Sequence, residues 1–299
     1  MRIVHKLVYP LQPALEVARE IAAVLGLATG STPIPVYQEL ARMHREEGLD
    51  FSSVRSINLD EYYGLSGDHP QSYRHFMHEH LFRHVNIQRC NTHFLDGSVP
   101  QDCIDRECDR YEALVSSCPP DIWLLGIGLN GHIAFNEPGS ACESRTRLVS
   151  LTPSTIEANR RFFGVDEQVP TSSLTVGIST ILKARKLVLL ATGDAKKCAV
   201  DAAFASVSSD CPASFLQGTD CGSGWTSSDS FACLQGQFSH SIILRLLVQY
   251  IFIYSHTVPY YQGQQYYFSE QWYSTHRVQS DKYFNQALKC LGMPDISYT

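Results

Sequence analysis

The chain has 299 residues, of which 44% are hydrophobic, and its 30 acidic and 24 basic side chains give a formal net charge of −6. This length and apolar content suffice for one substantial α/β core, and the negative charge argues against a nucleic-acid-binding surface. The C-terminal apolar run 242–254 is shorter than the roughly 20 residues that cross a bilayer, and Arg245 interrupts it. Residues 1–5 lack the pattern of a secretory signal, so we expect a cytoplasmic protein with neither a membrane nor a nucleic-acid partner.

The first motif is a strand followed by a turn of small residues. The apolar run 23–28 predicts a strand, and Gly30, Ser31 and Thr32 lead from it into a helical pattern that begins at Pro35. Free backbone N–H groups, hydroxyls and the positive end of a helix dipole make such a junction suited to a phosphate group. The lysine and the longer glycine spacing of a nucleoside-triphosphate loop are absent, which favours a small phosphorylated metabolite.

The second motif carries two adjacent acids. In SINLDEYYGL, residues 56–65, an alternating strand is predicted to end at Asp60 and Glu61. Neighbouring side chains of an extended chain point to opposite sides, so one of the carboxylates can face a cleft and serve as a general base. From these residues alone, a pair of solvated turn acids is the favoured alternative.

The third motif is DIWLLGIGLNGHIAFNEPG, residues 121–139, in which an apolar strand runs into a glycine-rich turn. The turn carries Asn130, His132 and Glu137, and a carboxylate near a histidine can fix its tautomer and raise its basicity. A structural histidine and a solvated glutamate remain the alternative. The glycines also satisfy GxGxxG, but the proline that follows argues against a dinucleotide site, and no HxxxH or HxH pattern supports a metal site.

Together LGLATGSTP, NLDEYYGL and GIGLNGHIAFNEPG resemble the glucosamine-6-phosphate deaminase family, which shares a superfamily with 6-phosphogluconolactonases. The resemblance continues through SRTRLVSLT, ANRRFFG, VPTSSLTVGISTIL and LLATGDAKK and covers about residues 1–217. It implies an open, mainly parallel sheet with helices on both faces and an active site at the carboxyl edge of the strands.

The resemblance also implies a hydrolase of amino sugar catabolism that converts D-glucosamine 6-phosphate to D-fructose 6-phosphate and ammonia, without a metal or cofactor. Asp60 matches the base that takes a proton from carbon 2 and returns one to carbon 1, and His132 matches the ring-opening histidine, paired with Glu137. Asn130 stands where some members carry aspartate and others asparagine, and the amide is expected to change the pH profile and not the reaction. The phosphate ligands implied are Gly30, Ser31, Thr32, Arg161 and Lys196. A sugar-phosphate sensor without catalysis is the alternative function.

Two regions depart from the family pattern. The first helix, within residues 14–22, is about a dozen residues short, and after Gln217 a Gly/Ser-rich stretch leads into an unfamiliar ending. We therefore expect an α/β domain over residues 1–217 and a divergent, partly disordered tail over 218–299. In activated members an arginine and a lysine bind N-acetylglucosamine 6-phosphate; Arg147 matches the arginine, but Val149 replaces the lysine, which predicts weak or absent activation. Relatives include monomers and hexamers, so a homo-oligomer stays open.

Overall fold

The computed structural model describes residues 24–217 and 231–235. The shortened helix predicted within residues 14–22 and the apolar run 242–254 lie outside the described residues, as does most of the predicted tail. No helix in the described part of the chain is both long enough and apolar enough to cross a bilayer.

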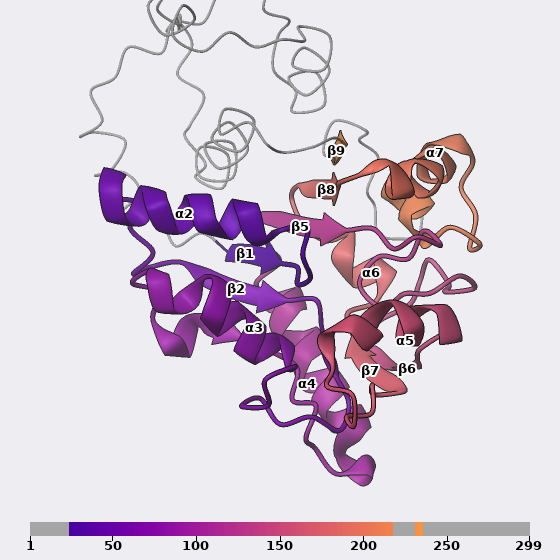
Figure 1. The fold of residues 1–299 in the computed structure, drawn as a ribbon, viewed down its shortest axis with the longest axis horizontal. Helices are drawn as coiled ribbons and strands as arrows, with labels where there is room; N and C mark the ends of the chain where they lie inside the picture. The colour runs from indigo at the N-terminus through magenta and orange to yellow at the C-terminus, as the bar shows by residue number, and fades with distance from the viewer. Residues whose placement is uncertain (1–23, 218–230, 236–299) are drawn as a thin grey trace, which may run out of the picture.

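The centre of the fold is a six-stranded sheet in which every neighbouring pair of strands is parallel (Figure 1). Its strands, in spatial order, are β4 (Thr92–His93), β2 (Arg55–Asn58), β1 (Val24–Leu27), β5 (Ile122–Gly126), β8 (Leu187–Ala191) and β9 (Phe231–Gln235). The last of these strands lies within the range predicted as tail and pairs with β8 along its full length. Parallel strands of this kind require crossover connections, which the helices provide.

Helices cover both faces of this sheet. The helices are α2 (Ile34–Glu47), α3 (Tyr73–His80), α4 (Ile104–Ser117), α5 (Pro153–Asn159), α6 (Ile178–Ile181) and α7 (Lys197–Ala205). One core cluster joins α2 and α3 to alternate residues of β1 and β5, and a second joins α4, α6 and α7 to the residues between them. The expected open, mainly parallel sheet with helices on both faces is confirmed.

The helices follow from local sequence. In α2, Val36, Tyr37 and Leu40 recur at helical spacing and are buried, and Gly48 ends the helix in the left-handed region at φ 73°. In α4, Cys108, Tyr111 and Val115 form the buried stripe on the opposite side of the sheet. Short 3₁₀ turns complete the connections: η1 (Phe82–His84), η2 (Arg89–Asn91), η3 (Gln101–Cys103), η4 (Arg160–Phe162), η5 (Asp194–Lys196) and η6 (Pro212–Gln217).

A second, antiparallel sheet was not expected from the sequence. It consists of β3 (Asp60–Tyr62), β7 (Ser172–Thr175) and β6 (Arg147–Ser150), in the order β3-β7-β6. The prediction of one strand that runs into the two acids is wrong, because β2 ends at Asn58 and the chain passes from one sheet to the other at Leu59. Leu59 is buried in the core and its carbonyl accepts the N–H of Val176, which fixes this crossing.

Candidate active site

Asp60 opens β3 and is 6% exposed. In the antiparallel sheet it lies opposite Thr175, which in turn lies opposite Arg147. Burial, and then the charge of Glu61, raises the pKa of Asp60 well above that of an ordinary aspartate. A carboxylate with a raised pKa is a stronger base than an exposed one, which suits proton abstraction from carbon.

Glu61 points to the other side of the strand, as the extended backbone requires. Its carboxylate accepts the backbone N–H groups of Tyr62 at 2.9 Å, Tyr73 at 2.9 Å and Arg74 at 3.1 Å. The last two belong to the first turn of α3, so Glu61 caps that helix. Burial raises the pKa of Glu61 to about 7, against the lowering effect of these hydrogen bonds. The two adjacent acids therefore have different surroundings. The Glu61 carboxylate is held by three backbone N–H groups, and these groups make no hydrogen bond to Asp60.

The turn after β5 depends on glycine. A Cβ at Gly128 would lie 2.2 Å from Cε1 of His132, so only glycine lets the imidazole lie against this backbone. Gly131 has φ 82°, in the left-handed region, and donates its N–H to Gly128 O. These glycines bring His132 back over the end of the strand.

Asn130, His132 and Glu137 are in direct contact. Nδ1 of His132 lies 2.7 Å from Asn130 Oδ1 and 3.4 Å from Glu137 Oε2, while Asn130 Nδ2 donates to the same Glu137 oxygen at 2.8 Å. Because the amide NH2 is committed to Glu137, its carbonyl faces His132, which assigns the proton to Nδ1 in the neutral ring. Nε2 then carries the lone pair and is the nitrogen that can accept a proton.

Two threonines from the next helix complete the surroundings of Glu137. Thr155 Oγ1 donates to Glu137 Oε1 at 2.5 Å and Thr152 Oγ1 donates to it at 3.2 Å. Burial acts to raise the pKa of Glu137, but hydrogen bonds from His132, Thr155 and Asn130 outweigh it and lower the pKa to about 2. Glu137 is therefore ionised at neutral pH and can stabilise a positive charge on His132.

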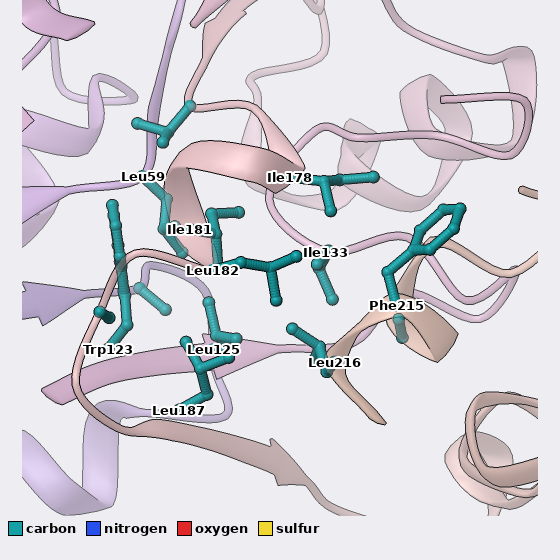
Figure 2. Packing of buried hydrophobic residues seen from close by; sticks show 14 of the residues in the cluster. Leu59, Trp123, Leu125, Ile133, Ile178, Ile181, Leu182, Leu187, Phe215 and Leu216 are labelled. Atoms are coloured by element: carbon teal, nitrogen blue, oxygen red, sulfur yellow. The ribbon is translucent and has the colours of Figure 1, made fainter. Parts of the chain in front are cut away.

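The loop that carries these residues is fixed to the core and to the strand opposite Asp60. Ile133 is fully buried, and Figure 2 shows it among Ile178 of α6, the C-cap residue Leu182 and Leu216 of η6. Phe135 donates its N–H to Thr175 Oγ1 at 3.2 Å. Because Thr175 is the residue paired with Asp60, the loop and the candidate base are held by one strand.

The side chain of Asn136 supplies a further anchor for this loop. Asn136 is fully buried, and its Nδ2 donates to Val176 O at 2.9 Å. This hydrogen bond ties the loop to the residue that follows β7. Four residues that contact the site were not predicted from the sequence: Thr152, Thr155, Thr175 and Asn136. Their contacts bridge segments far apart in the chain, and only the Thr152 N-cap of α5, which binds Thr155 N, follows a local sequence pattern.

The predicted phosphate turn lies at the carboxyl end of β1, which neighbours β5 in the sheet. Gly30 has φ 93°, and Ser31 and Thr32 form the turn that enters α2. Helix α2 has no side-chain cap at Pro33 and no acid in its first turn, so its N-terminal end offers backbone N–H groups and a positive dipole.

The two predicted cations lie near each other. Lys196 Nζ donates to Ile127 O at 2.6 Å, which places the ammonium beside the turn after β5. Burial, and then the charge of Arg161, lowers the pKa of Lys196. Arg161 is exposed at η4, and its guanidinium carbon lies 4.6 Å from the ring centre of Phe162. Two like charges in mutual repulsion form a site suited to an anion.

The described part of the chain offers no cluster of side chains suited to a metal ion. Within residues 24–217 and 231–235, no group of three or more His, Cys, Asp or Glu side chains is arranged to hold a metal ion. The chemistry that the described groups themselves can supply is proton transfer by His132 and Asp60, next to cations for a phosphate.

Comparison with known proteins agrees with the motifs. The family model described as glucosamine-6-phosphate isomerases/6-phosphogluconolactonase matches residues 3–225. Glucosamine-6-phosphate deaminases 1 and 2 of Giardia intestinalis are 58% and 60% identical to this chain over 215 residues, which is 68% of this chain and 80% and 81% of those proteins.

A solved structure gives the same answer. The structure of a monomeric glucosamine-6-phosphate deaminase is 38% identical to this chain, has a TM-score of 0.67, and is matched over 79% of this chain and 98% of its own length. The sequence resemblance is thus confirmed, and the chain belongs to the family of glucosamine-6-phosphate isomerases and 6-phosphogluconolactonases.

Proposed function

We propose that this chain is a glucosamine-6-phosphate deaminase that converts D-glucosamine 6-phosphate and water to D-fructose 6-phosphate and ammonia. The observation that carries the proposal is the contact of His132, Asn130 and Glu137 on a loop held by the strand opposite Asp60. The relatives at 58% and 60% identity bear that name. Asp60 and His132 can transfer protons, which an aldose-ketose isomerisation needs and a sensor that only binds a sugar phosphate does not.

The first step opens the sugar ring, and we assign it to His132. Nε2 of the neutral imidazole takes the proton of the hydroxyl on carbon 1 and delivers a proton to the ring oxygen as the bond between that oxygen and carbon 1 breaks. Both oxygens are attached to carbon 1, so one nitrogen can serve both. Glu137, ionised because its pKa is about 2, stabilises the imidazolium that forms between the two transfers.

The second step moves a proton between carbons, and we assign it to Asp60. Its carboxylate takes the proton from carbon 2 of the open-chain aldehyde, while the ammonium group on carbon 2 passes a proton to the oxygen on carbon 1, which gives an enol-amine. Asp60 then returns its proton to carbon 1, which leaves a protonated imine at carbon 2. The resulting imine at carbon 2 adds water and loses ammonia. The raised pKa of Asp60 brings the base closer to the basicity that this step needs.

The phosphate group provides the handle for binding. We assign it to the turn Gly30–Thr32, Arg161 and Lys196, because a helix end and two repelling cations favour a dianion. Neither step requires a metal or a cofactor. A cytoplasmic location and the division of the chain at residue 217 stay predictions.

Steady-state kinetics of matched variants tests this assignment. Arg161→Ala and Lys196→Ala are expected to raise KM for glucosamine 6-phosphate by about 10- to 100-fold, the effect of losing a charged hydrogen bond. Asp60→Asn and His132→Gln are expected to lower kcat instead and to leave binding of the sugar phosphate intact. A chain that binds the sugar phosphate without turnover before any substitution would favour the sensor function, and a loss of kcat in the cation variants would contradict the assignment.

A further inference from the structure

A contact between two segments about a hundred positions apart in sequence lies beside the candidate active site. Nε2 of His69 lies 3.0 Å from Oε1 of Glu167, and both side chains are partly exposed, at 29% and 35%. His69 belongs to the turn that follows β3, the strand of Asp60, and Glu167 follows η4, the turn that carries Arg161. The pair therefore joins the segment of the candidate base to the segment of the candidate phosphate ligand.

The His69 side of the contact is rigidly held. Its N–H donates to Ser66 O at 3.0 Å, and its carbonyl accepts the N–H of Ser72, the N-cap of α3, at 2.9 Å. Gln71 donates its backbone N–H to Nδ1 of His69 at 3.1 Å, so Nδ1 is the acceptor and Nε2 carries the proton in the neutral ring. His69 can thus donate to Glu167 without being charged.

On the other side of the contact, hydrogen bonds of Glu167 close a compact loop, residues 160–167, that contains Arg161. Glu167 accepts the N–H of Gly164 on Oε2 at 3.1 Å and donates its own N–H to Gly164 O at 3.1 Å. Arg160, the residue before Arg161, donates to the carbonyls of Glu167 at 2.5 Å and Val165 at 3.0 Å. Glu167 is therefore hydrogen-bonded both to Arg160, the first residue of η4, and to Gly164, two residues after η4 ends.

A second anchor of this loop is apolar. Phe163 is 8% exposed and meets the ring of Tyr62 edge-on, at 5.6 Å between ring centres. Arg161 itself is exposed, and its charge opposes that of Lys196. In the protein without substrate, repulsion between these cations acts to move Arg161 away, and the anchors on either side of η4 resist that movement.

We propose that His69 and Glu167 form a latch that positions Arg161 for the substrate phosphate, a role that rests on the proposed function. Neither residue needs to touch the substrate, so both are positioning residues. The latch is a hydrogen bond from Nε2 of the imidazole to the carboxylate of Glu167, and it ties the segment of Arg161 to the turn that leads from Asp60 to α3.

Two substitutions at position 69 separate the latch from the turn. In His69→Asn, the side-chain oxygen can still accept the N–H of Gln71, but no donor reaches Glu167. In His69→Gln, the longer amide can donate to Glu167 in place of Nε2. We expect His69→Asn to raise KM for glucosamine 6-phosphate about two- to fivefold, the size of a partly exposed pair, with kcat unchanged, and His69→Gln to restore most of the loss.

The coupling to Arg161 distinguishes a latch from general loosening. Glu167→Ala is expected to raise KM as His69→Asn does, and the double variant no further. In an Arg161→Ala background, His69→Asn is expected to leave KM unchanged. Equal KM values for His69→Asn and the unsubstituted chain, or an unchanged effect of His69→Asn in the Arg161→Ala background, would overturn the latch.

Amide hydrogen exchange provides a readout that does not depend on catalysis. The N–H groups of Gly164 and Glu167 are expected to exchange faster in His69→Asn than in His69→Gln or the unsubstituted chain. If the unsubstituted chain releases no ammonia from glucosamine 6-phosphate, the proposed function fails, and this measurement still decides whether the latch holds the loop. Equal exchange in all three proteins would overturn it.

Discussion

At the scale of single residues, Asn130 sets the proton arrangement of the candidate site. Its amide NH2 binds Glu137 at 2.8 Å and its carbonyl binds His132 at 2.7 Å, so one side chain fixes the tautomer of the histidine and the position of the acid. An aspartate at this position has no N–H to donate to Glu137 and brings a second negative charge to His132. Asparagine at this position thus offers a hydrogen bond where an aspartate would offer a charge.

Asn130→Asp is therefore expected to move the pH profile and keep the reaction. The added negative charge favours the positively charged form of His132, so the acidic limb of kcat/KM is expected to move to higher pH. The measurement is kcat/KM against pH for the two proteins. An acidic limb at the same or lower pH in the variant would contradict the assignment of His132 as proton acceptor.

At the scale of elements, the loop from Gly128 to Gly139 holds a residue in an unusual conformation. Ala134 has φ 50°, the one described non-glycine residue with positive φ. For an L-residue the left-handed region costs roughly 1–2 kcal/mol. The anchors on either side, Ile133 in the core and Phe135 on Thr175, explain how the loop sustains it.

Substitutions at Ala134 test whether the loop is strained. Ala134→Gly removes the strain, but the greater conformational entropy of glycine in the unfolded chain costs roughly 0.5–1 kcal/mol. The free energy of unfolding of the variant is therefore expected to equal that of the parent or to exceed it by up to about 1.5 kcal/mol. Ala134→Val, whose branched side chain tolerates positive φ poorly, is expected to lower it by more than about 1 kcal/mol. Thermal unfolding of both variants decides the matter, and a large loss in Ala134→Gly would contradict the strain.

A buried glutamate of α4, Glu112, is hydrogen-bonded to the residue before β6 and to residues in and just after α6. Glu112 is 2% exposed and accepts hydrogen bonds from Thr146, Thr180 and Lys183. Burial acts to raise its pKa, but these hydrogen bonds outweigh burial and lower the pKa of Glu112 to about 2.

The linkage of Glu112 to stability has a definite sign. Because the folded-state pKa lies below the unfolded value of about 4.5, the ionised group stabilises the fold at pH values above about 4.5, and this stability is lost as pH falls toward 2. We expect Glu112→Gln to be less stable at neutral pH and to show a shallower loss of stability over that range. The matched control is Glu157→Gln, an exposed site on α5. If the free energy of unfolding of Glu112→Gln fell between pH 4.5 and pH 2 as steeply as that of the parent, Glu112 would not be the source of this pH dependence.

Local sequence predicted the elements whose signals are local. The apolar runs that became β1 and β5, the glycines after them and the helical spacing of α2 all lie within short windows, and the parallel sheet follows from their alternation. The antiparallel sheet escaped prediction because β3 has three residues and pairs with a strand far along the chain, as in the bond from Ser173 Oγ to Glu61 O across 112 positions. For the same reason Thr175 and Asn136 could not be assigned to the site.

At the scale of the whole molecule, the prediction about activation rests on two residues of β6. Arg147, for which the sequence resemblance implies an effector-binding role, donates to Asn136 Oδ1 at 2.9 Å and Ser140 Oγ at 3.2 Å, so its guanidinium is already occupied within the chain. Val149, two residues on in the same strand, offers no charge.

We therefore expect no activation by N-acetylglucosamine 6-phosphate. The rate of ammonia release at a substrate concentration below KM should be the same with and without the acetylated sugar phosphate, or fall if the compound competes for the active site. A clear rise in rate, or a sigmoidal substrate curve that the acetylated sugar makes hyperbolic, would contradict this expectation.

We expect the full chain to deaminate glucosamine 6-phosphate with Asp60 as the base. The most direct test is to quantify ammonia and fructose 6-phosphate released by the purified 299-residue protein, beside Asp60→Asn, with cooperative unfolding confirmed for both. We expect equal amounts of the two products from the parent chain and a rate about a thousandfold lower in the variant, within the roughly 10²- to 10⁴-fold range of a general base. Turnover retained in Asp60→Asn, or a cooperatively folded parent that binds the sugar phosphate and releases no ammonia, would contradict it.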